Sequence, residues 1–110
     1  MTTAAFKTLA LSFPGTLEAP HFERSAFKVT GKRIFATLLE SDRTVNIPLR
    51  VAEQKAFCEL DEAHIFPVPN KWGLQGWTTF EIGHLDEAVM QEALTSAYND
   101  VMQPKPKRKR

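Results

Sequence analysis

The chain has 110 residues, of which 43% are hydrophobic and 25% charged, and this is the composition of one globular domain. Its net charge of +1 conceals an asymmetry, because residues 1–104 hold nine of the fourteen basic residues and all thirteen acidic ones, whereas the end of the chain is purely basic. A single cysteine excludes an intramolecular disulfide, and no stretch has the about 18 apolar residues of a membrane span or the pattern of a signal peptide, so we expect a cytoplasmic protein without a membrane partner.

The first half of the chain is expected to form one helix and three strands. A short helix is indicated by apolar residues in the i, i+3, i+4, i+7 pattern at Phe6, Leu9, Ala10 and Phe13. Pro14 and Gly15 end this helix, and residues 16–20 are read as a loop. Strands are predicted at 22–29, 33–39 and 45–49. Turn residues at 30–31 and 40–42 separate them, so the three strands form an antiparallel meander.

The second half of the chain predicts two strands and two helices. A short amphipathic helix is expected at 52–60, strands at 64–68 and 77–82, and a loop at 71–76. The last helix, over 85–102, has two adjacent rows of apolar residues spaced four apart, at Leu85, Val89, Ala93, Ala97 and Val101 and at Met90, Leu94, Tyr98 and Met102. Prolines at 104 and 106 exclude further helix, so residues 104–110 are expected to form a disordered basic tail.

The element order α-β-β-β-α-β-β-α predicts a two-layer α+β fold. An antiparallel five-strand sheet with the helices on one face buries the apolar side of every element in this order. The opposite face of the sheet would then stay more exposed. We expect the domain to cover residues 1–103. The sequence does not determine the oligomeric state, and a monomer is taken as the default.

Several short strings occur in a fixed order along residues 6–104. They are Pro20-His21-Phe22, GKRIFA at 31–36, Val45-Asn46-Ile47, Asn70-Lys71 with Gly76-Trp77-Thr78, and Ala97-Tyr98. In this order and spacing they resemble the MmcQ/YjbR family. The resemblance implies a two-layer α+β fold related to secretion-chaperone-like folds, and many members are described as DNA-binding proteins of a double-wing shape. It supplies no catalytic residue. Pro48 and Leu49 depart from the pattern, because many relatives have a lysine there, and the departure weakens a phosphate contact at that strand.

The spacing of histidine and cysteine gives no metal or catalytic motif. His21, His64 and His84 are too far apart in sequence to form a two-histidine helical metal motif. Cys58 and His64, with two acidic residues between them, could converge on a metal, but their spacing is not that of metal ligands, and Cys58 is expected to pack as a small apolar residue. We therefore expect no metal and no cofactor. An enzyme whose site is assembled from distant residues stays open as a third hypothesis.

A cluster of basic residues near two tryptophans is the candidate binding site. Its members are Arg24, Lys28, Lys32, Arg33, Arg43 and Lys71, together with Trp77. Arg24 and Lys28 share parity on one strand, so both point to the same face of the sheet. Convergent cations bind phosphates, and an exposed tryptophan can stack on a base, so the leading hypothesis is a non-enzymatic module that binds nucleic acid through this cluster and the tail. The same charges also fit a solvated face, with Trp72 and Trp77 closing the core. A protein-interaction adaptor that uses the exposed sheet face is the alternative function.

Overall fold

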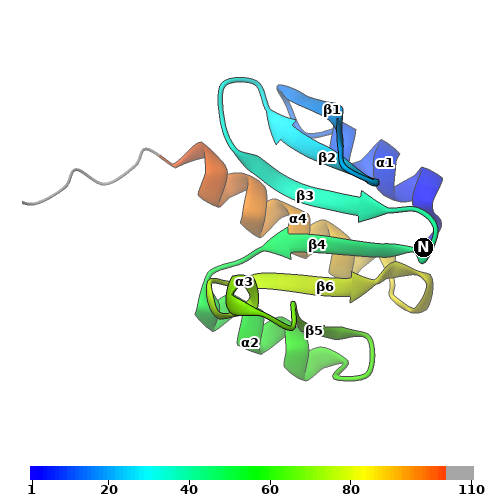
Figure 1. Ribbon diagram of the computed structural model, residues 1–110, viewed down its shortest axis with the longest axis vertical. Helices are drawn as coiled ribbons and strands as arrows, with labels where there is room; N and C mark the ends of the chain where they lie inside the picture. The colour runs from blue at the N-terminus through cyan, green and yellow to red at the C-terminus, as the bar shows by residue number, and fades with distance from the viewer. Residues whose placement is uncertain (104–110) are drawn as a thin grey trace, which may run out of the picture.

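The computed structural model describes residues 1–103, which form a six-stranded sheet with the long helices on one side (Figure 1). In chain order the elements are α1 (Thr3–Leu11), β1 (Thr16–His21), β2 (Arg24–Val29), β3 (Ile34–Leu39), β4 (Thr44–Pro48), α2 (Val51–Leu60), β5 (Ile65–Pro67), α3 (Lys71–Leu74), β6 (Trp77–Glu81), a 3-10 turn at Ile82–His84 and α4 (Glu87–Met102). The tail expected at 104–110 lies outside the described residues.

The strands are ordered β1-β2-β3-β4-β6-β5, and every neighbouring pair is antiparallel. The first four are consecutive in the chain and form a meander, whereas β6 pairs with β4 and leaves β5 at the far edge. β5 is short and ends at Pro67, with Pro69 two residues later. Proline cannot donate a backbone hydrogen bond, so this edge is protected from pairing with another strand. The expected α+β class with an antiparallel sheet is confirmed.

Aromatic contacts fix α1, α2 and α4 on the same face of the sheet. Phe6 of α1 packs edge-on against Phe27 of β2 at a ring-centroid distance of 5.6 Å. The corresponding pairs are Phe35 with Tyr98 for α4, at 5.6 Å, and Phe57 with Phe80 for α2, at 6.0 Å. Each buried aromatic removes about 150–250 Å² of apolar surface from water, so these three contacts are a large part of the core. Figure 1 shows the three helices behind the sheet.

The sheet has six strands because residues 16–20, read from the sequence as a loop, belong to β1, which extends to His21. The next strand accordingly starts at Arg24 and not at residue 22, since Phe22 and Glu23 are the turn between β1 and β2. β1 lies at the edge of the sheet, where half of its backbone N–H groups face solvent, and Pro20 is tolerated in such a strand. Because β1 is mostly exposed, its sequence lacks the alternation of apolar and polar residues by which a strand is recognised. The prediction of five strands was therefore wrong.

Two further boundaries differ from those predicted. Residues 71–74, expected in a loop, form the single turn of α3, capped by Asn70, whose side-chain oxygen accepts from the N–H of Trp72 at 2.8 Å. The last helix starts at Glu87, and both predicted apolar rows are buried or half-buried except for Met102, which is exposed where α4 ends. Within residues 1–103, no helix is long and apolar enough to cross a membrane.

Candidate nucleic-acid interface

The two ends of the sheet differ in charge. β2 and β4 finish at the end where β3 and β6 begin, and α4 also finishes there. We call this the basic end, because the basic residues it gathers are Lys28, Lys32, Arg33, Arg50 and Lys71. Its acidic residues are Glu53 and Asp100. The opposite end holds Arg24, Arg43 and Lys7, which forms an ion pair with Glu40, among the acidic residues Glu23, Glu40, Asp42, Asp61, Glu62, Glu81, Asp86 and Glu87. Sorted charge of this kind produces an electric field that orients a charged partner.

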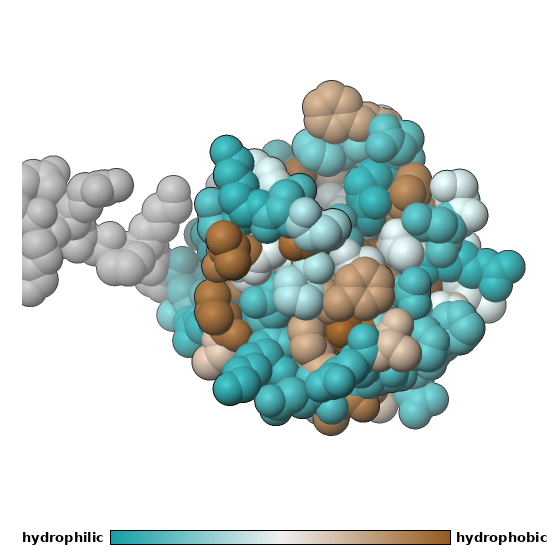
Figure 2. Space-filling view, turned by 60° about the horizontal axis from the view of Figure 1, so that its bottom comes forward, coloured by the Kyte–Doolittle hydropathy of each residue, from teal (hydrophilic) through white to brown (hydrophobic). Residues whose placement is uncertain are grey.

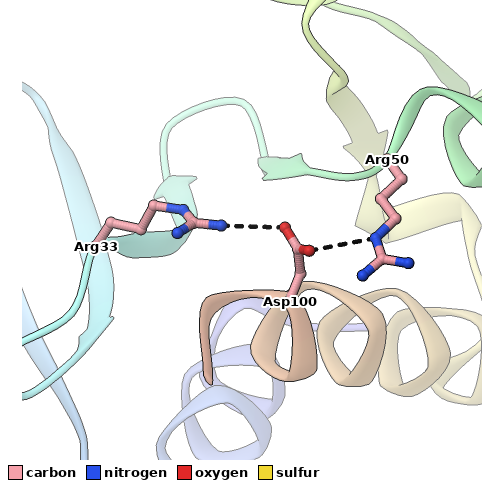
Figure 3. Close-up of polar contacts among 3 residues, drawn as sticks. All are labelled: Arg33, Arg50 and Asp100. Atoms are coloured by element: carbon pink, nitrogen blue, oxygen red, sulfur yellow. Dashed lines mark hydrogen bonds and ion pairs between the residues drawn. The ribbon is translucent and has the colours of Figure 1, made fainter. Parts of the chain in front are cut away.

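Two arginines of the basic end share one carboxylate (Figure 3). Arg33 donates from Nη2 to Oδ2 of Asp100 at 3.1 Å, and Arg50 donates from Nε to Oδ1 of the same residue at 3.3 Å. The three residues come from the β2–β3 loop, the β4–α2 junction and the last turn of α4, so the pair of contacts ties these segments together. Each guanidinium has five N–H donors and uses one of them in the bond to Asp100. The other donors of both arginines are available to bind a phosphate.

The β2–β3 loop, which carries Arg33, also presents Lys32 to solvent. Gly31 has a φ of +77°, and no atom lies within 4 Å of the position that a Cβ would occupy there. This is the turn that the glycine predicted, and it leaves Lys32 exposed at its tip. Lys28 is half-buried on the sheet face away from the helices, in the same strand as Arg24 and with the same parity, as predicted.

Arg24 and Arg43 do not join the other predicted cations. Arg24 lies across the outer face of the sheet and donates from Nε to Oγ1 of Thr37 at 2.9 Å. Burial lowers the pKa of this guanidinium, and the negative charges of Asp42 and Glu23 offset part of that decrease. Arg43 is exposed in the β3–β4 turn at the acidic end, with a left-handed φ of +57°. The predicted cluster is therefore divided between opposite ends of the sheet.

The two tryptophans differ in position. Trp77 is the first residue of β6, opposite Pro48, and is half-buried. Trp72 lies on α3 with 50% of its surface exposed, so it does not close the core, which corrects the expectation for this residue. Leu74, on the same turn, is 82% exposed. Figure 2 shows hydrophobic residues among hydrophilic ones at the left edge, the end at which α4 finishes.

The outer face of the sheet, proposed as an adaptor surface, contains two hydrogen-bonded polar pairs. Thr79 donates from Oγ1 to Oδ1 of Asn46 at 2.8 Å, and Arg24 bonds Thr37 on the neighbouring strand. These side chains satisfy one another across β2, β3, β4 and β6. Phe66, which pairs with Thr79, and Trp77, two residues before Thr79, share this face, so polar and apolar side chains are mixed on it.

The histidines lie away from the basic end. The ring of His64 stacks on that of His84 with centroids 4.2 Å apart, and its Nδ1 lies 3.0 Å from Oδ2 of Asp61. The hydrogen bond to His64 holds the pKa of Asp61 below its ordinary value. Within residues 1–103, no three side chains of His, Cys, Asp or Glu are placed to hold a metal ion. A groove of about 640 Å³ between α2 and α4 contains Glu92 but no histidine, so it offers no pair of groups for acid–base catalysis.

The family model described as YjbR matches residues 11–100 of the chain. The chain belongs to the YjbR family. Among solved structures, the YjbR-family chain is similar to the Deinococcus radiodurans protein DR2400, which carries a DUF419 domain, with a TM-score of 0.77 and 20% sequence identity. The match covers 93% of this chain and 79% of the other, and at this identity it shows a shared fold. No curated protein matches.

Packing accounts for a leucine at residue 49, where the resemblance led us to expect a lysine. Leu49 is buried, and its N–H donates to the carbonyl of Gly76 at 3.0 Å. A charged side chain at this position would lose its hydration without a partner. Arg50 follows directly, is exposed and lies at the basic end, so the positive charge is present one residue later. The sequence analysis missed Arg50. In the predicted meander, the end of the third strand lies at the same side of the sheet as the turn between the first two strands. Comparing these two positions would have placed Arg50 beside Lys32 and Arg33.

Proposed function

We propose that this YjbR-family domain is a non-enzymatic module that binds nucleic acid through its basic end. The observation that carries the proposal is the sorting of charge along the strands, which places Lys28, Lys32, Arg33, Arg50 and Lys71 together although the described residues are acidic in sum. The chain also continues from Gln103, at this same end, into the basic sequence 104–110. The basic sequence therefore follows directly on a residue of the basic end.

The mechanism is neutralisation of backbone phosphates with release of counterions. Lysine and arginine contacts to phosphate carry affinity but no base identity, so binding should show little sequence preference. Arg33 and Arg50 keep free donors beside Asp100, and the carboxylate fixes their spacing. Ordered arginines lose less side-chain entropy on binding than free ones, so the shared carboxylate favours the complex as well as the fold.

Charge reversal at matched positions tests this function. The double variant Lys32→Glu with Lys71→Glu is compared with Arg43→Glu with Lys55→Glu, which changes the net charge equally with exposed residues outside the basic end. Binding of a labelled duplex is measured by fluorescence anisotropy over a series of salt concentrations. We expect the first variant to bind more weakly and to lower the log–log salt slope by about 0.9 for each phosphate that the protein no longer neutralises. The control variant should keep the slope of the wild type.

The same assay distinguishes the contribution of the terminal segment to binding from that of the folded surface. A chain ending at Gln103 should bind more weakly than the full-length chain yet still respond to the reversal of Lys32 and Lys71. If the shortened chain does not bind, and the reversal leaves the full-length chain unchanged, residues 104–110 alone carry the affinity and the proposal for the folded domain is wrong. Equal weakening by both double variants would likewise contradict it, because net charge alone would then explain the binding.

A further inference from the structure

The indole of Trp72 is held at the basic end by a rigid support. α3 is a single turn, and an isolated turn of helix is not stable by itself, so its geometry comes from its contacts. The buried side chain of Gln54, from α2, donates from Nε2 to the carbonyls of Gly73 at 2.9 Å and Trp77 at 3.1 Å. These two bonds hold Gly73, within the turn, and Trp77, the first residue of the strand that follows it.

Close backbone packing completes this support. A Cβ at Gly73 would lie 2.0 Å from the carbonyl oxygen of Val68, and one at Gly76 would lie 1.8 Å from that of Leu49. Only glycine permits such an approach, so the backbone within α3 and in the loop that follows it is pressed against its neighbours. The Asn70 cap adds a third constraint. The whole arrangement orders a turn whose indole is half exposed, so the ordering does not serve to bury Trp72.

Basic residues lie at the same end of the sheet as Trp72. Lys71 precedes it in α3, and Gly76, four residues after Trp72, packs on the carbonyl of Leu49, which is followed by Arg50. A tryptophan face next to positive charge suits a base whose phosphate is bound nearby, since every base has a π-face and stacking needs no particular sequence. In a duplex the bases are already stacked on one another, so an indole outside the grooves reaches unpaired bases only.

We infer that Trp72 is a stacking platform for an unpaired base, so that the basic end takes single-stranded nucleic acid in preference to duplex; this rests on the proposed function. The same mixture of indole, aliphatic and basic side chains also occurs in proteins that lie on anionic membranes. Those proteins insert the apolar face of a long amphipathic helix, and the four residues of α3 provide no such face. The observations therefore favour nucleic acid.

The test uses the full-length protein, an oligothymidylate and a duplex with the same number of phosphates. Trp72→Ala should weaken binding of the oligothymidylate about 5- to 150-fold, the loss of one base–aromatic stack, and leave duplex affinity and its salt slope unchanged. Leu74→Ala, on the same exposed turn, is the matched control and should bind both as the wild type does. Unchanged thermal unfolding checks that each variant is folded.

A conservative variant distinguishes stacking from a general change of surface. Trp72→Phe should keep most of the single-strand affinity while abolishing the quenching of tryptophan fluorescence that the oligothymidylate causes in the wild type, because Trp77 is then the only indole. Equal loss of single-strand and duplex binding in Trp72→Ala, or no loss at all, overturns the stacking role but leaves the proposed function standing. If neither oligonucleotide binds the wild type, the proposed function itself fails. A fluorescence response only to vesicles of anionic phospholipid would assign this surface to membranes and overturn both.

Discussion

Single side chains of α4 set the rotation of this helix against the sheet. Leu94 is buried between Met90 and Tyr98, as the spacing of apolar residues predicts. Leu94→Ala should lower the free energy of unfolding by about 2–5 kcal/mol, because it removes buried methyl groups and leaves a cavity. Urea denaturation measures the change. The exposed neighbour Thr95 is the control, and Thr95→Ala should stay within about 0.5 kcal/mol. A comparably small effect at Leu94 would mean that another face of α4 meets the sheet.

The thiol of Cys58 illustrates how a local environment suppresses chemistry. Burial raises its pKa, and the neighbouring charges of Glu59 and Glu62 raise it further. The thiolate is the reactive form, so at neutral pH the folded protein should react with a thiol reagent more slowly than the protein unfolded in urea. The labelling rate should rise with pH in both states, but the rise should occur at a higher pH in the folded protein, because the pKa of the thiol is higher there. Equal rates in the two states at neutral pH would contradict the half-buried environment.

Among the connecting elements, the glycine that follows α3 is the most constrained. Gly76 has a φ of +108°, and its backbone faces the Leu49 carbonyl so closely that a side chain cannot fit. Gly76→Ala should therefore cost more than the about 1–2 kcal/mol of left-handed backbone strain alone. Gly31→Ala is the control, because Gly31 also has a positive φ but has open space around it. Equal losses of stability in urea for the two variants would show that packing at Gly76 contributes nothing.

The sequence predicts best those elements that have one side exposed to solvent and one side buried in the core. The buried rows of α4 and the alternation of Val45 and Ile47 in β4 follow from this contrast. β1 and α3 lack it. β1 is an edge strand that owes its conformation to pairing with β2, and α3 is too short to show a helical period. Phe22, 90% exposed and at a left-handed φ of +59°, occupies a turn position where the sequence has no glycine to reveal it.

Removal of the terminal basic segment should not affect folding of the domain. Residues 104–110 contain prolines and cations but no large apolar side chain, so they have nothing to add to the core. We expect a chain that ends at Gln103 to have nearly the melting temperature of the full-length chain in calorimetry. A decrease of roughly 4–8 °C, which corresponds to about 1 kcal/mol in a domain of this size, would show that the segment packs on the domain.

Local patterns in the sequence predicted the family, the α+β class and the residues of α4 that form the core, because the hydrophobic effect acts on each helix and strand separately. The candidate site is not local in this sense. Arg24 and Arg43 lie near Lys28 and Lys32 in sequence but at the other end of the sheet, while Arg33, Arg50 and Asp100 meet from segments far apart. Antiparallel strands reverse direction at each turn, so charges a strand length apart are separated and those two strands apart are brought together. The exposure of Trp72 likewise depends on Gln54 and the Val68 carbonyl, which contact α3, and on the Leu49 carbonyl, which contacts the loop after it; these contacts exist only once the sheet has formed.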